Sequence, residues 1–209
     1  MLPALSQRMD NGGLVRPVRT ILLHQGMKQL QLHALMVGAT IAMFGAALAV
    51  NELFLLPLEF APGINWIYLP AGVRLLATLL FAEAGAVGLF LVGWAACAFI
   101  FFPDDPLRSV AGGFLGAFAP YLVYLAMRYR FGLQASLANL TPARLLYCAL
   151  AYSIASPLLH HLWFGLAEHK SGLLGSFVAM ASGDFCGTIV VLYGAKLALN
   201  LLAPRKKGP

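Results

Sequence analysis

Hydrophobic residues occur along the chain in six long runs, separated by short segments rich in proline, glycine and charge. A helix needs about 20 apolar residues to cross the ~30 Å hydrocarbon core of a bilayer, and each run approaches or exceeds that length. Turn residues fill 57–65, and the proline-rich segment 102–106 cannot stay helical in lipid. We therefore predict six transmembrane helices, at about 34–57, 66–82, 84–103, 108–128, 143–166 and 173–202.

Two of the breaks between runs predict local structure. Only Glu83 separates the second run from the third, so these two runs are expected to form a tight helical hairpin. Thr141 and Pro142 supply a helix cap and a first-turn proline where the fifth run begins. The breaks thus support the division into six spans.

Both ends of the chain are more polar than the predicted six-span domain at 34–202. Residues 1–16 are interpreted as a disordered cytoplasmic tail, and residues 203–209 as a basic cytoplasmic tail. Between them, residues 17–33 alternate apolar with basic or amide residues, which is typical of an amphipathic interfacial helix. The alternative is that this segment simply extends the first span into the cytoplasm.

The positions of the lysines and arginines predict the orientation. With the N-terminus inside the cell, only Arg108 and Lys170 lie outside, and Arg74 lies within a span. The other basic residues are then cytoplasmic, as the positive-inside rule requires: Arg8, Arg16, Arg19, Lys28, Arg128, Arg130, Arg144, Lys196, Arg205, Lys206 and Lys207. We predict a multi-pass protein of the bacterial inner membrane with both termini in the cytoplasm.

Composition agrees with an all-α integral membrane protein. Hydrophobic residues make up 60% of the chain and charged residues 11%, against about a quarter in soluble domains. The net charge of +6 does not indicate nucleic acid, because the basic residues sit in connections and at the termini rather than on one stripe. Three cysteines without metal-binding spacing predict no disulfide framework and no thiolate metal site.

A few polar residues fall inside the predicted spans, where an ionisable side chain costs about 2.5–3.5 kcal/mol to insert. At 1.5 Å per residue, Glu52 and His161 lie ~8 Å below the outer ends of their helices, Arg74 ~12 Å and Asp184 ~16 Å. Their similar depth predicts one polar pocket in the outer half of the bilayer. It could bind an anionic or polar ligand, or Arg74 and an acidic partner could form a structural ion pair.

Aromatic and helix-breaking residues mark the rim of this predicted pocket. Trp66 and Tyr68 stand at the outer boundary, where aromatic residues are common, and are included among the ligand-binding candidates. The Pro70-Ala71-Gly72 sequence that follows weakens the helix at the start of its span. Non-helical backbone at this depth requires protein or a water-filled cavity to satisfy it.

No catalytic set or cofactor site is predicted. His160 and His161 are adjacent on a helix and point about 100° apart, so they do not form a simple metal pair, although the sequence does not decide whether either one binds a metal or haem. The chain lacks the common hydrolase, metalloprotease and phosphate-binding motifs. We therefore expect a non-enzymatic protein without a cofactor.

Small residues recur at four-residue spacing in two spans. These pairs are Gly112 with Gly116, and Gly183 with Gly187. Such spacing lets helix backbones approach closely, which favours packing within the bundle; a homo-oligomer face is the alternative.

Two short segments resemble the MASE1 family of bacterial membrane-embedded sensory domains. They are Trp66 to Gly72, an aromatic-x-x-x-Pro-Ala-Gly sequence leading into a span, and Ser182 to Gly187, which contains Gly-Asp-x-x-Gly. The matching positions are Pro70, Gly72, Gly183, Asp184 and Gly187. The resemblance implies sensing through the membrane, coupled to a cytoplasmic cyclase, phosphodiesterase or kinase. The family usually has about eight spans and a fused output domain, so this chain would be a shortened relative.

We expect a membrane sensory or ligand-binding protein that contacts lipid and acts through a separate membrane or cytoplasmic protein. One alternative is a small transporter or the substrate-binding subunit of one, since six spans in about 200 residues is also that scale. Another is an accessory subunit of a larger membrane complex, in which the polar residues only fix packing.

Overall fold

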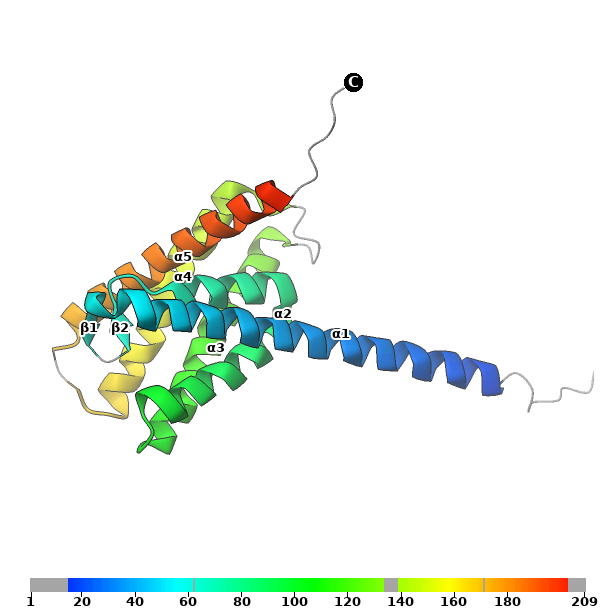
Figure 1. Cartoon of the computed structure of the whole chain (residues 1–209), viewed down its shortest axis with the longest axis horizontal. Coiled ribbons are helices and arrows are strands. Elements are labelled where there is room, and N and C mark those ends of the chain that lie inside the picture. The colour runs from blue at the N-terminus through cyan, green and yellow to red at the C-terminus, as the bar shows by residue number, and fades with distance from the viewer. Residues whose placement is uncertain (1–14, 62, 134–138, 171, 203–209) are drawn as a thin grey trace, which may run out of the picture. The chain divides into compact units, whose positions relative to one another are not determined.

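The structure is a computed structural model that describes residues 15–61, 63–133, 139–170 and 172–202. It is mostly helical (Figure 1). The predicted tails lie almost entirely outside these residues. The elements, in chain order, are α1 (Val15–Val50), η1 (Asn51–Leu55), η2 (Leu56–Leu58), β1 (Glu59–Ala61), β2 (Ile64–Asn65), α2 (Leu69–Ala96), η3 (Cys97–Phe101), α3 (Pro106–Phe131), α4 (Pro142–Leu166) and α5 (Leu174–Leu202).

Within the described residues, five helices are long and apolar enough to cross a membrane. They are compatible with a multi-pass membrane protein. They span Gln25–Leu58, Leu69–Phe101, Pro106–Phe131, Pro142–Leu166 and Leu174–Ala198. The predicted second and third spans fall together in α2 and η3, so the count of five differs from the predicted six at this one place.

The chain folds back within α2 at Ala82, whose φ of 49° and ψ of −120° are not helical. A Cβ added at Gly85 would lie against the carbonyl oxygen of Ala77. Residues eight apart in a continuous helix are separated by ~12 Å along the axis, so this contact requires a reversal. The tight turn expected at Glu83 therefore occurs one residue earlier.

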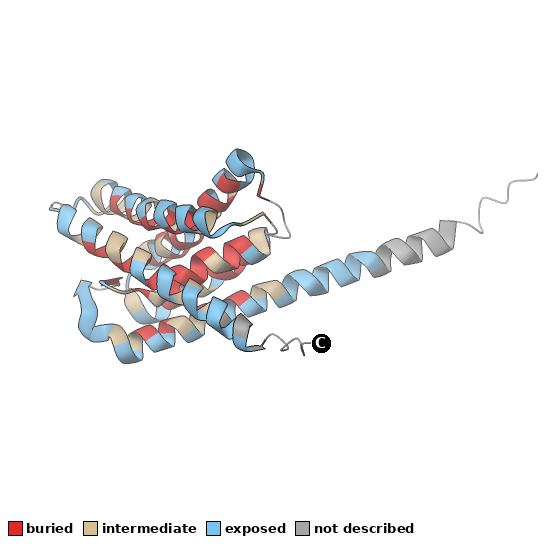
Figure 2. Cartoon of the chain, turned by 90° about the horizontal axis from the view of Figure 1, so that it is seen from above, coloured by how far each residue is buried: buried red, intermediate tan, exposed pale blue. Residues whose placement is uncertain are grey.

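The chain divides into two units between Leu35 and Met36. α1 runs through this point without a break, and its side chains from Gln25 to Leu35 are exposed (Figure 2). No change of helix marks the predicted boundary between an interfacial helix and the first span, at residues 33 and 34.

In the larger unit, α2 packs against α3 and α5, and α4 packs against α3 and α5. Buried residues lie on the facing sides of these helices (Figure 2). One apolar cluster joins α2, α3 and α4 around Leu75, Val123 and Tyr152, and a second includes Phe44 and Leu89. Together they hold α2 in the middle of the bundle.

A loop that contains the short antiparallel pair β1–β2 leads into α2. The Leu69 backbone N–H donates to Asn51 Oδ1 over 3.1 Å, and the Tyr68 N–H donates to the Gly183 carbonyl over 3.1 Å. A Cβ at Gly183 would meet the Asn65 carbonyl, and one at Gly187 would meet the Tyr68 carbonyl. Glycine on α5 therefore lets this loop lie directly on the helix, with its donors satisfied.

The starts of α3 and α4 are capped by side chains. The Arg144 N–H donates to Thr141 Oγ1 over 3.3 Å, as expected for the Thr141-Pro142 start. The Arg108 N–H donates to Asp105 Oδ1 over 2.9 Å, so Asp105 caps α3. These caps position the two helices that, with α2, surround the candidate site.

Candidate functional site

Arg74 lies in the second turn of α2 and is 8% exposed. Its Cζ lies 5.2 Å from the centre of the Phe44 ring and 5.5 Å from that of the Tyr68 ring, within cation–π range. On α3, a Cβ at Gly116 would come within 3.0 Å of Arg74 Nη2. The absence of a side chain at Gly116 thus makes room for the guanidinium.

Among the described residues, no carboxylate lies within the 4.0 Å of an ion pair with the Arg74 guanidinium, and the Tyr152 hydroxyl is close enough for a weak hydrogen bond with it. Tyr152 and Asp184 are near enough to interact with it electrostatically. Cation–π contacts contribute about 0.5–2 kcal/mol each, less than the cost of removing a charge from water. Arg74 therefore lacks the ion-pairing carboxylate that would offset the cost of burying its guanidinium among the described residues.

A cavity of about 70 Å³ opens beside Arg74. Its polar wall comes from Arg74, Tyr68, His160 and Arg108. The remainder is largely apolar: Gly63, Ile64, Cys97, Phe101, Phe102, Gly112, Leu115, Trp163, Phe164 and Met180. Such a cavity has room for a few water molecules or a small ligand.

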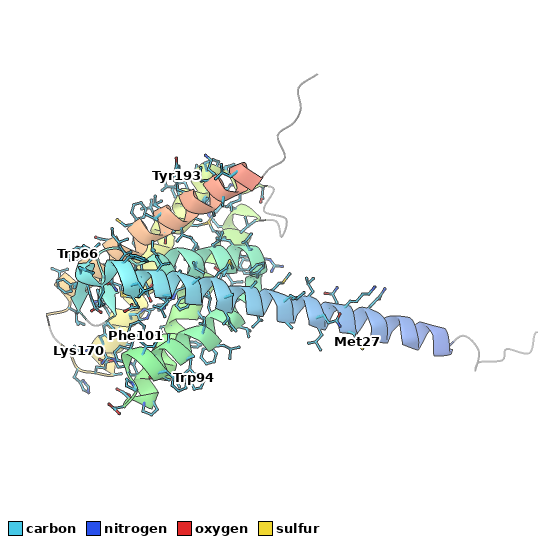
Figure 3. All side chains as sticks on the ribbon, viewed as in Figure 1. Met27, Trp66, Trp94, Phe101, Lys170 and Tyr193 are labelled. Carbon is cyan, nitrogen blue, oxygen red and sulfur yellow. The ribbon has the colours of Figure 1, made fainter. Side chains whose placement is uncertain are left out.

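Arg108 lines the cavity and is partly exposed, and we call this end of the cavity its mouth. Here Arg108 forms a charged cluster with Glu168 and Lys170. Arg108 Nε lies 3.2 Å from Glu168 Oε1, an ion pair without hydrogen-bond alignment, and Lys170 Nζ lies 2.8 Å from Glu168 Oε2. Trp163 Nε1 also donates to Glu168, over 3.2 Å. Phe101 and Lys170 are labelled at this end of the molecule in Figure 3. Glu168 thus balances part of the charge at the mouth.

A second set of buried polar groups lies between α4 and α5. It comprises Tyr152 and Ser156 on α4, and Asp184 and Thr188 on α5. Each is at most 1% exposed, and their hydroxyl and carboxylate oxygens have no hydrogen-bond partner among the described residues. Ser156 and Tyr152 are near enough to Asp184 to interact with it. Buried polar groups in native proteins are nearly always partnered, and Ser156 is close enough to Asp184 and Tyr152 for weak hydrogen bonds with both.

The two adjacent histidines lie in different surroundings. His161 packs between α4 and α5, with Nδ1 2.8 Å from the Pro157 carbonyl oxygen and Nε2 2.9 Å from Ser176 Oγ. His160 lines the cavity, and its Nδ1 lies 2.8 Å from the Ser156 carbonyl oxygen. In the described part of the chain, no cluster of three or more His, Cys, Asp or Glu residues could hold a metal ion.

The structure brings together some of the residues that the sequence singles out. Arg74 and Tyr68 line the cavity, and Asp184 lies within electrostatic range of Arg74. Glu52 lies in η1, away from the cavity lining, and Trp66 is 43% exposed and packs edge-on against Phe60. His161 also lies outside the lining.

The motif glycines occupy close approaches between segments. Gly112 lines the cavity, and a Cβ there would come within 2.8 Å of Cys97 Sγ. A Cβ at Gly72 would meet the backbone of α5 at Gly187 and Thr188, both 2.9 Å away. Pro70, in the first turn of α2, is buried beside this contact. These contacts are all within the bundle.

Sequence reasoning missed Phe44, Tyr152, Ser156, Thr188 and the cavity-facing position of His160. A signal existed for three of them. Tyr152 and Ser156 are four residues apart on one helix, as are Asp184 and Thr188 on another, and such pairs share a helix face. Phe44 carries no such signal, because an aromatic residue in an apolar helix is usual.

The arrangement is suited to holding an anion. It supplies a positive charge without an ion-pair partner among the described residues, in a partly enclosed space with largely aromatic walls. The cavity lining contains no carboxylate, and its histidine is engaged with a backbone carbonyl. The geometry is therefore that of a binding site with a charged anchor.

Comparison of the chain with family models, with curated proteins and with solved structures found no match to any of them. The resemblance to the MASE1 family therefore rests on the two short motifs alone.

Proposed function

We propose that this protein is a non-enzymatic sensory or ligand-binding protein of the bacterial inner membrane, which binds a small ligand beside Arg74 and acts through a separate protein partner. One observation carries the proposal: a nine-tenths-buried arginine that forms no ion pair with any described residue lines a cavity. An unpaired buried charge is costly, and a ligand that pairs with it would offset that cost.

The membrane setting is supported by the outward-facing residues of the helices. Large apolar side chains are exposed on each of α1 to α5, among them Val87, Phe114, Leu158 and Val190. A soluble monomer rarely leaves so much apolar surface in water. Lipid contact accounts for it.

We further propose that the chain crosses the membrane six times, with α2 crossing on each side of its reversal at Ala82. The contact between Gly85 and Ala77 supports this, because it makes the two halves of α2 antiparallel. Six crossings place both termini on one side, and the distribution of lysine and arginine favours the cytoplasm. The cavity mouth, with Arg108 and Lys170, would then face outward.

The proposed sensory role requires a separate partner protein. A ligand bound at the outer side can be reported inside the cell only if it changes the bundle, and the change must reach an effector. The MASE1 resemblance points to a cyclase, phosphodiesterase or kinase as that effector. Transport and a purely structural role are the alternatives that the sequence predicts.

The test is to purify the full chain from its native membrane in mild detergent and to analyse it by native mass spectrometry. We expect a bound small molecule that is lost in Arg74→Gln and retained in Arg128→Gln, a control that removes an exposed charge on α3. Equal occupancy in both variants, or no ligand in any preparation, would contradict the proposal.

Proteins that copurify separate the alternatives. A cyclase, phosphodiesterase or kinase would support sensing. An ATPase module would favour transport, and a redox or photosynthetic complex would favour an accessory role.

A further inference from the structure

We propose that the ligand of this cavity is a small carboxylate, held by Arg74 and packed by its non-polar part against the aromatic wall. This inference rests on the proposed function, because it names the ligand class for the same site. It follows from the charge, the shape and the size of the cavity.

Of the two arginines that line the cavity, Arg74 is the one that forms no ion pair with a described residue. Arg108 is paired with Glu168, which also holds Lys170. Arg74 has no such partner, and the fourteen described residues that line the cavity include neither aspartate nor glutamate. A cation would meet only repulsion here, whereas an anion would meet an unpaired charge.

The apolar wall favours a carboxylate over a phosphate. A guanidinium presents parallel N–H groups that either anion accepts in bidentate fashion. The phosphate oxygens that do not face Arg74 would lie against apolar side chains without donors, which is costly.

The apolar part of the cavity wall determines which non-polar group the ligand can carry. Phe101, Leu115, Phe164 and Met180 present apolar surface and offer no side-chain donors. The Nδ1 atom of His160 is engaged with the Ser156 carbonyl. A volume of about 70 Å³ admits a molecule of a few heavy atoms. A short-chain carboxylate meets both conditions.

Asp184 provides an independent check on the sign of the charge. It does not line the cavity, but it lies within electrostatic range of Arg74 without forming an ion pair. Its carboxylate would repel a bound anion. We expect Asp184→Asn to tighten carboxylate binding by roughly two- to fivefold, since one nearby like charge is removed. Weaker binding would contradict the inference, provided that the variant folds like the unaltered protein.

The experiment titrates the full chain, in lipid nanodiscs at constant ionic strength, with propanoate, with its neutral isostere propanamide and with inorganic phosphate. Binding is read from the rise in the thermal unfolding midpoint, since a ligand that binds only the folded state stabilises it. We expect a saturable rise with propanoate alone. Arg74→Gln should weaken propanoate binding on the order of tenfold or more, the value of a lost charge-assisted hydrogen bond.

Two further variants keep the test decisive. Arg128→Gln should bind propanoate like the unaltered protein, because it removes an exposed charge elsewhere on α3. Arg74→Lys keeps the charge but not the bidentate geometry, and it serves if Arg74→Gln does not fold. We expect Arg74→Lys to bind propanoate more weakly than the unaltered protein.

The outcomes separate this inference from the proposed function. Equal binding of propanoate and propanamide, or tighter binding of phosphate, would overturn the carboxylate and leave a ligand-binding site. If no probe binds, the copurified molecule decides: an Arg74-dependent carboxylate supports the inference, and any other Arg74-dependent molecule overturns it. No Arg74-dependent ligand of any kind would overturn both.

Discussion

Two arginines line the same cavity, and their surroundings differ. Arg108, at the mouth, has 26% of its side chain exposed and pairs with Glu168. Arg74, deeper in the bundle, is 8% exposed and has aromatic rings in place of a carboxylate. At the mouth, Glu168 forms an ion pair with Arg108, whereas no described carboxylate forms one with Arg74.

The difference shows where a ligand can act. Arg108 already forms an ion pair, so an incoming anion would gain less from it than from Arg74. Arg74 forms no ion pair with a described residue, so an anion bound beside it would offset the cost of its buried charge. We therefore expect Arg108 to have a structural role and Arg74 to have a role in binding. Variants near each arginine test this difference.

The largest effect is expected where the loop that carries Tyr68 lies on α5. Gly187→Ala would drive a Cβ into the Tyr68 carbonyl and to 3.0 Å from the Leu69 backbone nitrogen. Overpacking against backbone costs about 1–3 kcal/mol, so thermal unfolding in detergent should occur several degrees lower.

Gly194→Ala is the matched control for Gly187→Ala. It lies on the same helix, and nothing is found within 4 Å of its added Cβ. Alanine is favoured over glycine in a helix, so this variant should be at least as stable as the unaltered protein. A similar loss of stability in Gly187→Ala and Gly194→Ala would show that the contact between the loop and α5 does not explain the effect of Gly187→Ala.

The next effect concerns the position of Arg74. Gly116→Ala would place a Cβ 3.0 Å from Arg74 Nη2 and 3.1 Å from its Cζ, so the guanidinium must shift by a few tenths of an ångström. We expect propanoate affinity to fall by roughly three- to tenfold, because bidentate hydrogen bonds depend on alignment. The titration described above measures it.

The unfolding midpoint of Gly116→Ala without ligand should change little, since a side chain rather than backbone gives way. Unchanged propanoate affinity would show that Gly116 does not control the position of Arg74 in the binding site. A fall in stability matching that of Gly187→Ala would instead make Gly116 a simple packing residue.

The smallest effect is expected at the mouth. A double-mutant cycle with Arg108→Gln and Glu168→Gln should give a coupling energy of about 0.2–1 kcal/mol, typical of partly exposed pairs. The coupling should shrink at higher salt, which screens exposed charges. The coupling energy is measured from the unfolding of the unaltered protein, the two single variants and the double variant at two salt concentrations. A coupling energy above about 2 kcal/mol would contradict the expected difference between Arg108 and Arg74.

Much of the fold could be predicted from the chain because helices in an apolar setting are specified locally. The hydrophobic runs identified the long helices, and Thr141 with Pro142 marked the start of α4. The reversal near Glu83 was also expected, although it occurs at Ala82 and leaves one helix where two spans were predicted. The continuity of α1 through residues 33 and 34 was not decided by its pattern, because an amphipathic segment suits either a surface helix or an extension.

The sequence by itself determined which residues are costly inside an apolar bundle, and it singled out Arg74 and Asp184 on that ground. Only the tertiary structure decided their neighbours. It placed Phe44 and Tyr68 around the guanidinium, turned His160 rather than His161 toward the cavity, and left Glu52 and Trp66 outside it. Burial cost is a property of one side chain, whereas a partner depends on how helices far apart in the chain rotate and pack against one another.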